Sequence, residues 1–188
     1  MVIIDDDVSS ISDLHTYLHQ HFDMKSLGKL RYFLCLEIYD TIDGIYLFQT
    51  KYAYDLISRV GLTDSKIAST PLEADCRLTP LDGTTIKDPT FYRQLVGSLI
   101  YLTITRPNIA YVVHIISQLM TSPHTTNHSD VLRTLRYIKG TLLHGLHFSV
   151  DSSLIPIGYS DADWAGDPTD RRSITSYCFF LGDSLVSR

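Results

Sequence analysis

Three consecutive acidic residues, Asp5, Asp6 and Asp7, are the first candidates for chemistry in this sequence. Paired carboxylates can hold the two magnesium ions of a polymerase. In a polymerase, such a pair lies on a tight turn between two apolar strands. Here the triplet follows one apolar stretch and opens a helical pattern, where acidic side chains cap the helix and complement its dipole. The context favours capping over a metal site.

A second acidic cluster runs from Asp161 to Asp167, directly after a predicted strand. Gly166 is the sixth residue from Asp161, as in a calcium-binding loop, but Ala165 and Arg172 stand at positions that need oxygen ligands. A calcium loop is therefore excluded. An aspartate at a strand end can hold magnesium, and an acid-rich structural turn is the alternative for Asp161.

Two further sets of side chains have suggestive spacing. His15 and His19 are four residues apart on one predicted helix, which suits a transition metal, with Asp23 one turn further. A solvated helix face explains this pattern better, because the neighbouring positions are also polar.

Basic residues recur at spacings of three along another predicted helix, at Arg133, Arg136 and Lys139. Such a strip can follow a phosphate backbone. Without further context, a solvated helix face is the simpler interpretation.

The elements that must position these residues follow from periodicity and turn signals. Helices are predicted at 8–22, 52–60, 91–105, 107–120 and 129–143, and strands at 32–39, 45–49, 146–150, 155–160 and 173–181. Residues 63–89 lack periodicity and predict an irregular loop that contains a domain boundary. No closing element is predicted after residue 181.

Composition limits the classes of protein. The chain has 188 residues, 44% of them hydrophobic, and a net charge of −5, so it is globular and lacks an overall basic signature. Only residues 71–150 are basic, with seven Lys and Arg against five Asp and Glu. No stretch is long enough to span a membrane, and three scattered cysteines indicate a reducing compartment. We expect an intracellular, soluble protein, and the compartment stays open.

Taken together, the segments resemble the Pol polyprotein of plant Ty1/copia-type retrotransposons over essentially the whole chain. The order and spacing of several strings carry this resemblance, and no single one decides it. They are Met24–Gly28, Tyr32–Ile38, Gln49–Ala53, Ser69–Leu72, Tyr92–Thr103, Thr105–Tyr111, Leu135–Thr141, Tyr159–Asp167 and Arg171–Ser173. The sequence departs from the family where Ile4-Asp5 replaces Thr-Gly, and where Cys35 and Ser176 each replace Gly.

The resemblance implies an α+β fold in three parts. Residues 1–70 are expected to be the C-terminal part of a reverse transcriptase palm with a primer-grip-like hairpin over Tyr32–Gln49. Residues 71–150 are expected to be the helical thumb and connection, and residues 151–188 the first strands of a truncated ribonuclease H-like domain. By the same resemblance, the catalytic Tyr-x-Asp-Asp turn precedes Met1 and the later ribonuclease acids follow Arg188.

The resemblance also implies site residues and partners. Asp161 matches the first catalytic, metal-binding aspartate of the ribonuclease H-like site, which is incomplete in this sequence. The nucleic-acid-binding residues are expected to be Phe33, Leu34, Cys35, Arg133, Arg136 and Lys139. The intact family enzyme uses Mg²⁺, and we expect none to be bound functionally here. The implied partners are an RNA/DNA template–primer duplex and the missing Pol segments, with no membrane.

Two hypotheses follow for function. The first is a fragment of a reverse transcriptase and ribonuclease H polyprotein, homologous to both enzymes and inactive alone because neither active site is complete. The alternative is a non-catalytic nucleic-acid- or protein-binding module derived from it. Salt-dependent binding to a primer–template duplex distinguishes them.

We predict that the purified 188-residue protein neither extends a primer nor degrades the RNA of a hybrid, with magnesium or manganese. Two-metal catalysis needs convergent carboxylates around ions roughly 3.5–4 Å apart, which one aspartate cannot provide. Asp161→Asn should therefore leave both assays unchanged. Magnesium-dependent extension that disappears when Asp5 and Asp6 are substituted would instead identify the triplet as a catalytic turn.

Overall fold

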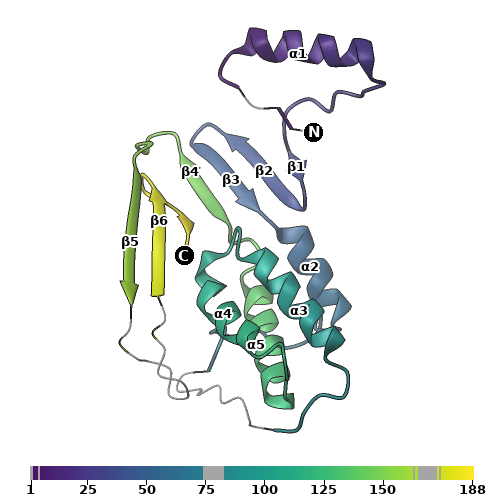
Figure 1. Cartoon of the computed structure of the whole chain (residues 1–188), viewed down its shortest axis with the longest axis vertical. Coiled ribbons are helices and arrows are strands. Elements are labelled where there is room, and N and C mark those ends of the chain that lie inside the picture. Colours follow the sequence, from purple (N-terminus) through teal and green to yellow (C-terminus); the bar gives the residue numbers. More distant parts are fainter. Residues whose placement is uncertain (1, 4, 74–82, 163, 165–172, 174) are drawn as a thin grey trace.

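The computed structural model describes residues 2–3, 5–73, 83–162, 164, 173 and 175–188, and these residues have a mixed α and β fold (Figure 1). The helices are α1 (Val8–His21), α2 (Thr50–Arg59), α3 (Pro89–Leu102), the 3-10 helix η1 (Pro107–Ile109), α4 (Ala110–Gln118) and α5 (Thr125–Gly140). The strands are β1 (Tyr32–Phe33), β2 (Leu36–Thr41), β3 (Gly44–Phe48), β4 (Leu146–Ser149), β5 (Pro156–Ala162), β6 (Thr175–Leu181) and β7 (Ser184–Ser187).

Helices α2 to α5 form one hydrophobic core. Its largest fully buried side chains include Ile57, Tyr92, Leu95, Leu99, Leu102, Ile109, Ile116, Leu135 and Ile138. The hydroxyl of Tyr92 donates to the Ile116 carbonyl oxygen at 3.0 Å, so its buried polar atom is satisfied. Because α2 shares this core with α3 and α5, packing continues across the boundary predicted near residue 70. The three-part division remains a prediction.

The first sheet has the strand order β1-β2-β3-β4, and every neighbouring pair is antiparallel. Strand β4 follows the helical core in sequence and returns to pair with β3, with Leu47 opposite Leu146. Glycines permit the close approach at both ends of this pairing. A Cβ on Gly44 would lie 2.1 Å from the Phe148 carbonyl oxygen, and one on Gly145 would lie 2.2 Å from that of Leu47.

The continuous strand predicted over 32–39 is wrong, because a turn at Leu34 and Cys35 divides it into β1 and β2. Both turn residues have positive φ, 47° and 61°, which no strand accommodates. The segment 32–49 therefore contains two successive hairpins rather than one.

The second sheet has the order β5-β6-β7. The strands predicted at 155–160 and 173–181 are confirmed as β5 and β6, and they pair antiparallel. The expectation of no closing element is wrong, since β7 pairs with β6 and also contacts β4 and η1. The side chains of β5 are exposed along its whole length.

Helix boundaries were predicted with mixed success. Helix α1 is confirmed, and Asp7 caps it by accepting hydrogen bonds from the Ser9 N–H at 2.9 Å and the Ser10 hydroxyl at 2.7 Å. Helix α5 begins at Thr125 rather than at residue 129. Its start is set by His124, whose N–H donates to Asn127 Oδ1 at 2.8 Å in a capping box.

The α1 helix has no buried residue, and Figure 1 shows it apart from the sheets and the helical core. On its apolar face, where Val8, Ile11, Leu14, Leu18 and Phe22 recur at spacings of three and four, Val8 is 77%, Leu14 43% and Phe22 60% exposed, while Ile11 and Leu18 are half-buried. Among the helices in the described part of the chain, none is long and apolar enough to cross a membrane.

We predict that Leu99→Ala lowers the free energy of unfolding by about 2–5 kcal/mol, because it leaves a cavity at a fully buried site in the core. Urea unfolding measures the change. Leu27→Ala is the control, since Leu27 is 86% exposed and its truncation should change stability by less than about 0.5 kcal/mol. Equal effects of the two substitutions would contradict the placement of this core.

Candidate nucleic-acid interface

The turn between β1 and β2 brings together three of the predicted site residues, Phe33, Leu34 and Cys35. A two-residue turn with positive φ at both positions matches the twist of the strands that it joins, and it favours Asn and Gly. Leucine and cysteine carry a Cβ, so both are strained in this conformation. The family resemblance implies glycine at position 35, and the positive φ of this turn gives a physical reason for that preference.

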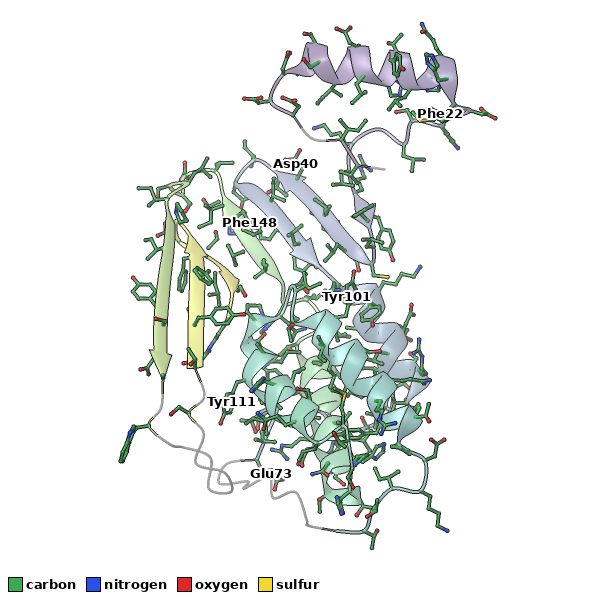
Figure 2. The ribbon with its side chains drawn as sticks, in the orientation of Figure 1. Phe22, Asp40, Glu73, Tyr101, Tyr111 and Phe148 are labelled. Atoms are coloured by element: carbon green, nitrogen blue, oxygen red, sulfur yellow. The ribbon has the colours of Figure 1, made fainter. Side chains whose placement is uncertain are left out.

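A tyrosine from the helical core anchors this turn. The hydroxyl of Tyr101, near the C-terminal end of α3, donates a hydrogen bond to the Leu34 carbonyl oxygen. The ring of Tyr52 from α2 meets the Tyr101 ring edge-on, with centroids 5.2 Å apart. Burial raises the pKa of Tyr101, which keeps its hydroxyl protonated as a donor. Figure 2 shows Tyr101 at the end of the core that lies beside the first sheet.

The side chains around the turn are accessible to a partner. Leu34 is 66% exposed, Tyr32 53% and Phe33 39%, while Cys35 is half-buried. A hydrogen bond with the Cys35 thiol, aided by desolvation, raises the pKa of the Tyr32 hydroxyl. We call Tyr32, Phe33 and Leu34 the hairpin tip. It presents apolar and aromatic surface on a backbone that is fixed to the core.

The predicted basic strip on α5 already has partners within the chain. One terminal nitrogen of Arg133 lies 2.7 Å from Glu73 Oε1, and the other donates to Thr70 Oγ1 at 3.1 Å. Only 22% of the Arg133 side chain is exposed, so this ion pair is partly protected from solvent.

The other two residues of the strip also face the chain that follows α2. Lys139 Nζ donates to the carbonyl oxygens of Thr63 and Ser65 at 2.5 and 2.6 Å. The carbonyl oxygen of Arg136 accepts from the Ala68 N–H at 3.4 Å, and Arg136 Nε is buried without a partner among the described residues. The strip therefore holds residues 63–73 against α5, and a contact with phosphate remains a prediction.

The structure does not bring the strip and the hairpin tip together. Glu73, the ion-pair partner of Arg133, and Tyr101, the anchor of the tip, lie toward opposite ends of the helical core (Figure 2). A short contact with the tip therefore does not include Arg133.

Asp161 lies on the exposed strand β5, opposite Ser176 of β6. Its Oδ1 accepts a hydrogen bond from the Ala162 N–H at 2.9 Å. Asp163 and Asp167, which belong to the same acidic cluster in the sequence, are outside the described residues. Within the described ranges, no group of three His, Cys, Asp or Glu residues is arranged to hold a metal ion.

The other metal candidates have structural roles. Hydrogen bonds from Ser10 and Ser9 hold the pKa of Asp7 below its usual range, and Asp5 accepts from the Asp7 N–H at 3.0 Å. The capping interpretation of Asp7 is thus confirmed. The rings of His15 and His19 pack edge to face, with centroids 4.7 Å apart.

Sequence reasoning missed a buried polar cluster where three of the resemblance strings meet. The hydroxyl of Thr105 donates to Gln49 Oε1 at 2.9 Å, and the next residue, Arg106, donates to the Thr141 hydroxyl. Arg106 is only 2% exposed, although it is a charged residue. The available signal was an arginine between apolar segments and directly before Pro107, which starts η1.

Comparisons with known proteins show which family the chain resembles. Residues 1–74, which contain the hairpin tip, match the family described as reverse transcriptase (RNA-dependent DNA polymerase). The retrovirus-related Pol polyprotein from transposon RE1 of Arabidopsis thaliana is 37% identical over 194 residues, covering 100% of this chain and 13% of the polyprotein. The corresponding polyprotein from transposon TNT 1-94 of Nicotiana tabacum is 33% identical over 196 residues, covering 100% of this chain and 15% of the polyprotein.

An uncharacterized mitochondrial protein of A. thaliana is 41% identical over 170 residues, covering 90% of this chain and 70% of that protein. These matches define the class of protein as reverse transcriptase-related. The chain belongs to the family of Ty1/copia-type retrotransposon Pol polyproteins and matches their reverse transcriptase region. No solved structure matches it.

We predict that Cys35→Gly raises the free energy of unfolding by about 1 kcal/mol, because glycine removes the Cβ strain at a φ of 61°. Cys178→Gly is the matched control. Cys178 lies in the extended strand β6, where glycine only adds backbone entropy to the unfolded state and loses packing, so stability should fall by about 1 kcal/mol. Urea unfolding of both variants measures the difference, and a loss of stability in Cys35→Gly would refute the strained turn.

Proposed function

We propose that this chain is a duplex-holding part of a reverse transcriptase, in which the hairpin tip contacts the primer strand. The anchoring of the tip carries the proposal. The hydrogen bond from Tyr101 to the Leu34 carbonyl oxygen fixes an exposed turn of Tyr32, Phe33 and Leu34 to a packed helical core. A contact that positions a primer must not move relative to its scaffold, and this arrangement meets that requirement.

The proposal divides the chain as the family resemblance suggests. Residues 1–70 contribute the end of the palm with the tip, residues 71–150 the thumb and connection, and residues 151–188 the beginning of a ribonuclease H-like sheet. The common core of α2 with α3 and α5 supports a palm segment seated directly on the thumb helices. The β5–β6 hairpin with Asp161 supports the third assignment.

In this proposal, the chain by itself performs no polymerisation and no RNA cleavage. Reverse transcriptases generally use Mg²⁺, which carboxylates hold between enzyme and substrate phosphates. Asp7 is engaged as a helix cap, and Asp161 is a single exposed carboxylate in the described part of its cluster. The described residues therefore do not fit a magnesium site, and the convergent acids would come from other Pol segments.

A protein-binding role is the second candidate, and α1 is the observation that favours it. Val8, Leu14 and Phe22 follow one side of α1 and expose apolar surface, and the helix has no buried residue. Another segment of a Pol polyprotein would cover this face in the assembled enzyme. Unchanged duplex affinity in variants of the hairpin tip would favour this second candidate.

We predict that the chain binds an RNA–DNA primer–template duplex and that its affinity falls steeply with added salt, as phosphate counterions are released. Replacing Phe33 and Leu34 with Ala should weaken binding by roughly tenfold, because the tip then loses its apolar contacts with the duplex. Fluorescence anisotropy of a labelled duplex at several salt concentrations measures both effects.

Ile42→Ala is the matched control for this experiment. Ile42 is 97% exposed in the turn between β2 and β3. The substitution therefore removes apolar surface from a neighbouring hairpin without changing the tip. Reversal of Arg133 and Arg136 to Glu tests the strip separately. It should reduce binding only if duplex competes successfully with Glu73 and Thr70 for Arg133. Binding that ignores both salt and the tip variants would refute the proposed function.

A further inference from the structure

A groove lined by both polar and apolar groups lies where the first sheet, the end of α5, η1 and the start of β7 meet. Its volume is 760 Å³, which is large enough for a nucleotide-sized group. Figure 1 shows this junction, where the C-terminal end of the chain lies between the second sheet and the helical core. The residues that carry its chemistry are Arg106, Asn108, Tyr137, His144, His147 and Asp183.

Arg106 is the unusual feature of this groove. Its side chain is only 2% exposed, yet no carboxylate lies within ion-pair distance of it among the described residues. One terminal nitrogen donates to the Thr141 hydroxyl, while Nε is buried and has no hydrogen-bond partner in the part of the chain that the structure describes. Burial lowers the pKa of Arg106, but a guanidinium in a protein keeps its charge. A buried cation that lacks a counter-charge attracts an anion from solvent.

The neighbouring groups are suited to the same anion. Asn108 Nδ2 donates to the Tyr137 hydroxyl oxygen at 2.9 Å, which leaves the hydroxyl hydrogen of Tyr137 free to donate to a ligand. His144 adds an imidazole from the segment between α5 and β4. His147 also lines the groove, but its Nε2 lies 3.9 Å from Asp43 Oδ2 and its ring stacks on Tyr46. Asp183 is the one acidic side chain in the lining, against the arginines Arg106 and Arg188.

We propose that this groove binds a phosphate group, with Arg106 as the central donor and Tyr137 as a second donor. A planar guanidinium and a hydroxyl match the several acceptor oxygens of a phosphate better than the single charge of a halide. The phosphate can belong to a nucleic-acid backbone or be free in solution, since both offer the same oxygens. This site is separate from the hairpin tip, and it does not depend on the proposed function.

The test uses the full chain and its thermal unfolding in phosphate against chloride at equal ionic strength. Phosphate should raise Tm by roughly 3–6 °C at about ten times its Kd, because it binds only the folded state. Arg106→Met should abolish this shift. Without phosphate the same variant should unfold at a similar or higher temperature, since an uncompensated buried charge has been removed. Arg59→Met, at an exposed arginine on α2, is the control and should keep the shift.

A second variant protects the test against misfolding. If Arg106→Met does not fold, Tyr137→Phe decides, because it removes one donor and should weaken phosphate binding by about tenfold, measured by calorimetry. A phosphate shift that survives in Arg106→Met, unchanged affinity in Tyr137→Phe, or no shift in the unmodified chain would each overturn the proposal.

Two further measurements identify the source of the phosphate and distinguish binding in this groove from binding at the hairpin tip. A ten-nucleotide oligothymidylate that competes with inorganic phosphate identifies a backbone ligand, and binding of inorganic phosphate alone identifies a free one. Either outcome keeps the phosphate site. Phe33→Ala should leave the phosphate-induced rise in Tm unchanged. Failure of duplex binding at the tip and failure of phosphate binding in the groove are therefore measured independently.

Discussion

The pairing of β3 with β4 is the constraint on which the rest of the structure depends. The two strands are joined in register from Gly44 opposite Ser149 to Leu47 opposite Leu146, and the whole helical core lies between them in sequence. Closing so long a segment costs chain entropy that the core must offset. The pairing then fixes where the core, the hairpin tip and the second sheet lie, because β7 packs against β4.

Buried polar links secure the same junction from the side of the helices. Gln49 at the start of α2 bonds to Thr105, and Arg106 bonds to Thr141 at the end of α5. These residues are far apart in sequence, and their bonds join the two ends of the core directly beneath the first sheet. The same arrangement leaves a buried guanidinium beside the groove, so one structural junction also creates a candidate anion site.

The distribution of cations favours placing the proposed nucleic-acid contact away from the most basic segment of the sequence. The basic strip on α5 donates hydrogen bonds to residues 63–73, namely to Glu73 and to the carbonyl oxygens of Thr63 and Ser65. The hairpin tip carries little charge and owes its position to Tyr101. In the proposed function, nucleic-acid contact is therefore expected from an anchored apolar turn rather than from a charged helix face.

The sequence by itself determined the elements whose signals are local. The Asp7 cap, the helical periodicity of α1 to α4 and the β5–β6 hairpin follow from side-chain spacing and capping chemistry within a few residues. Only the tertiary structure decided the turn at Cys35, the partners of Arg133 and the burial of Arg106. Each of these depends on residues distant in the chain, such as Tyr101 beside Leu34, or Glu73 beside Arg133. A charged side chain has the same identity in sequence whether it faces solvent or another segment, and only the fold places its partner.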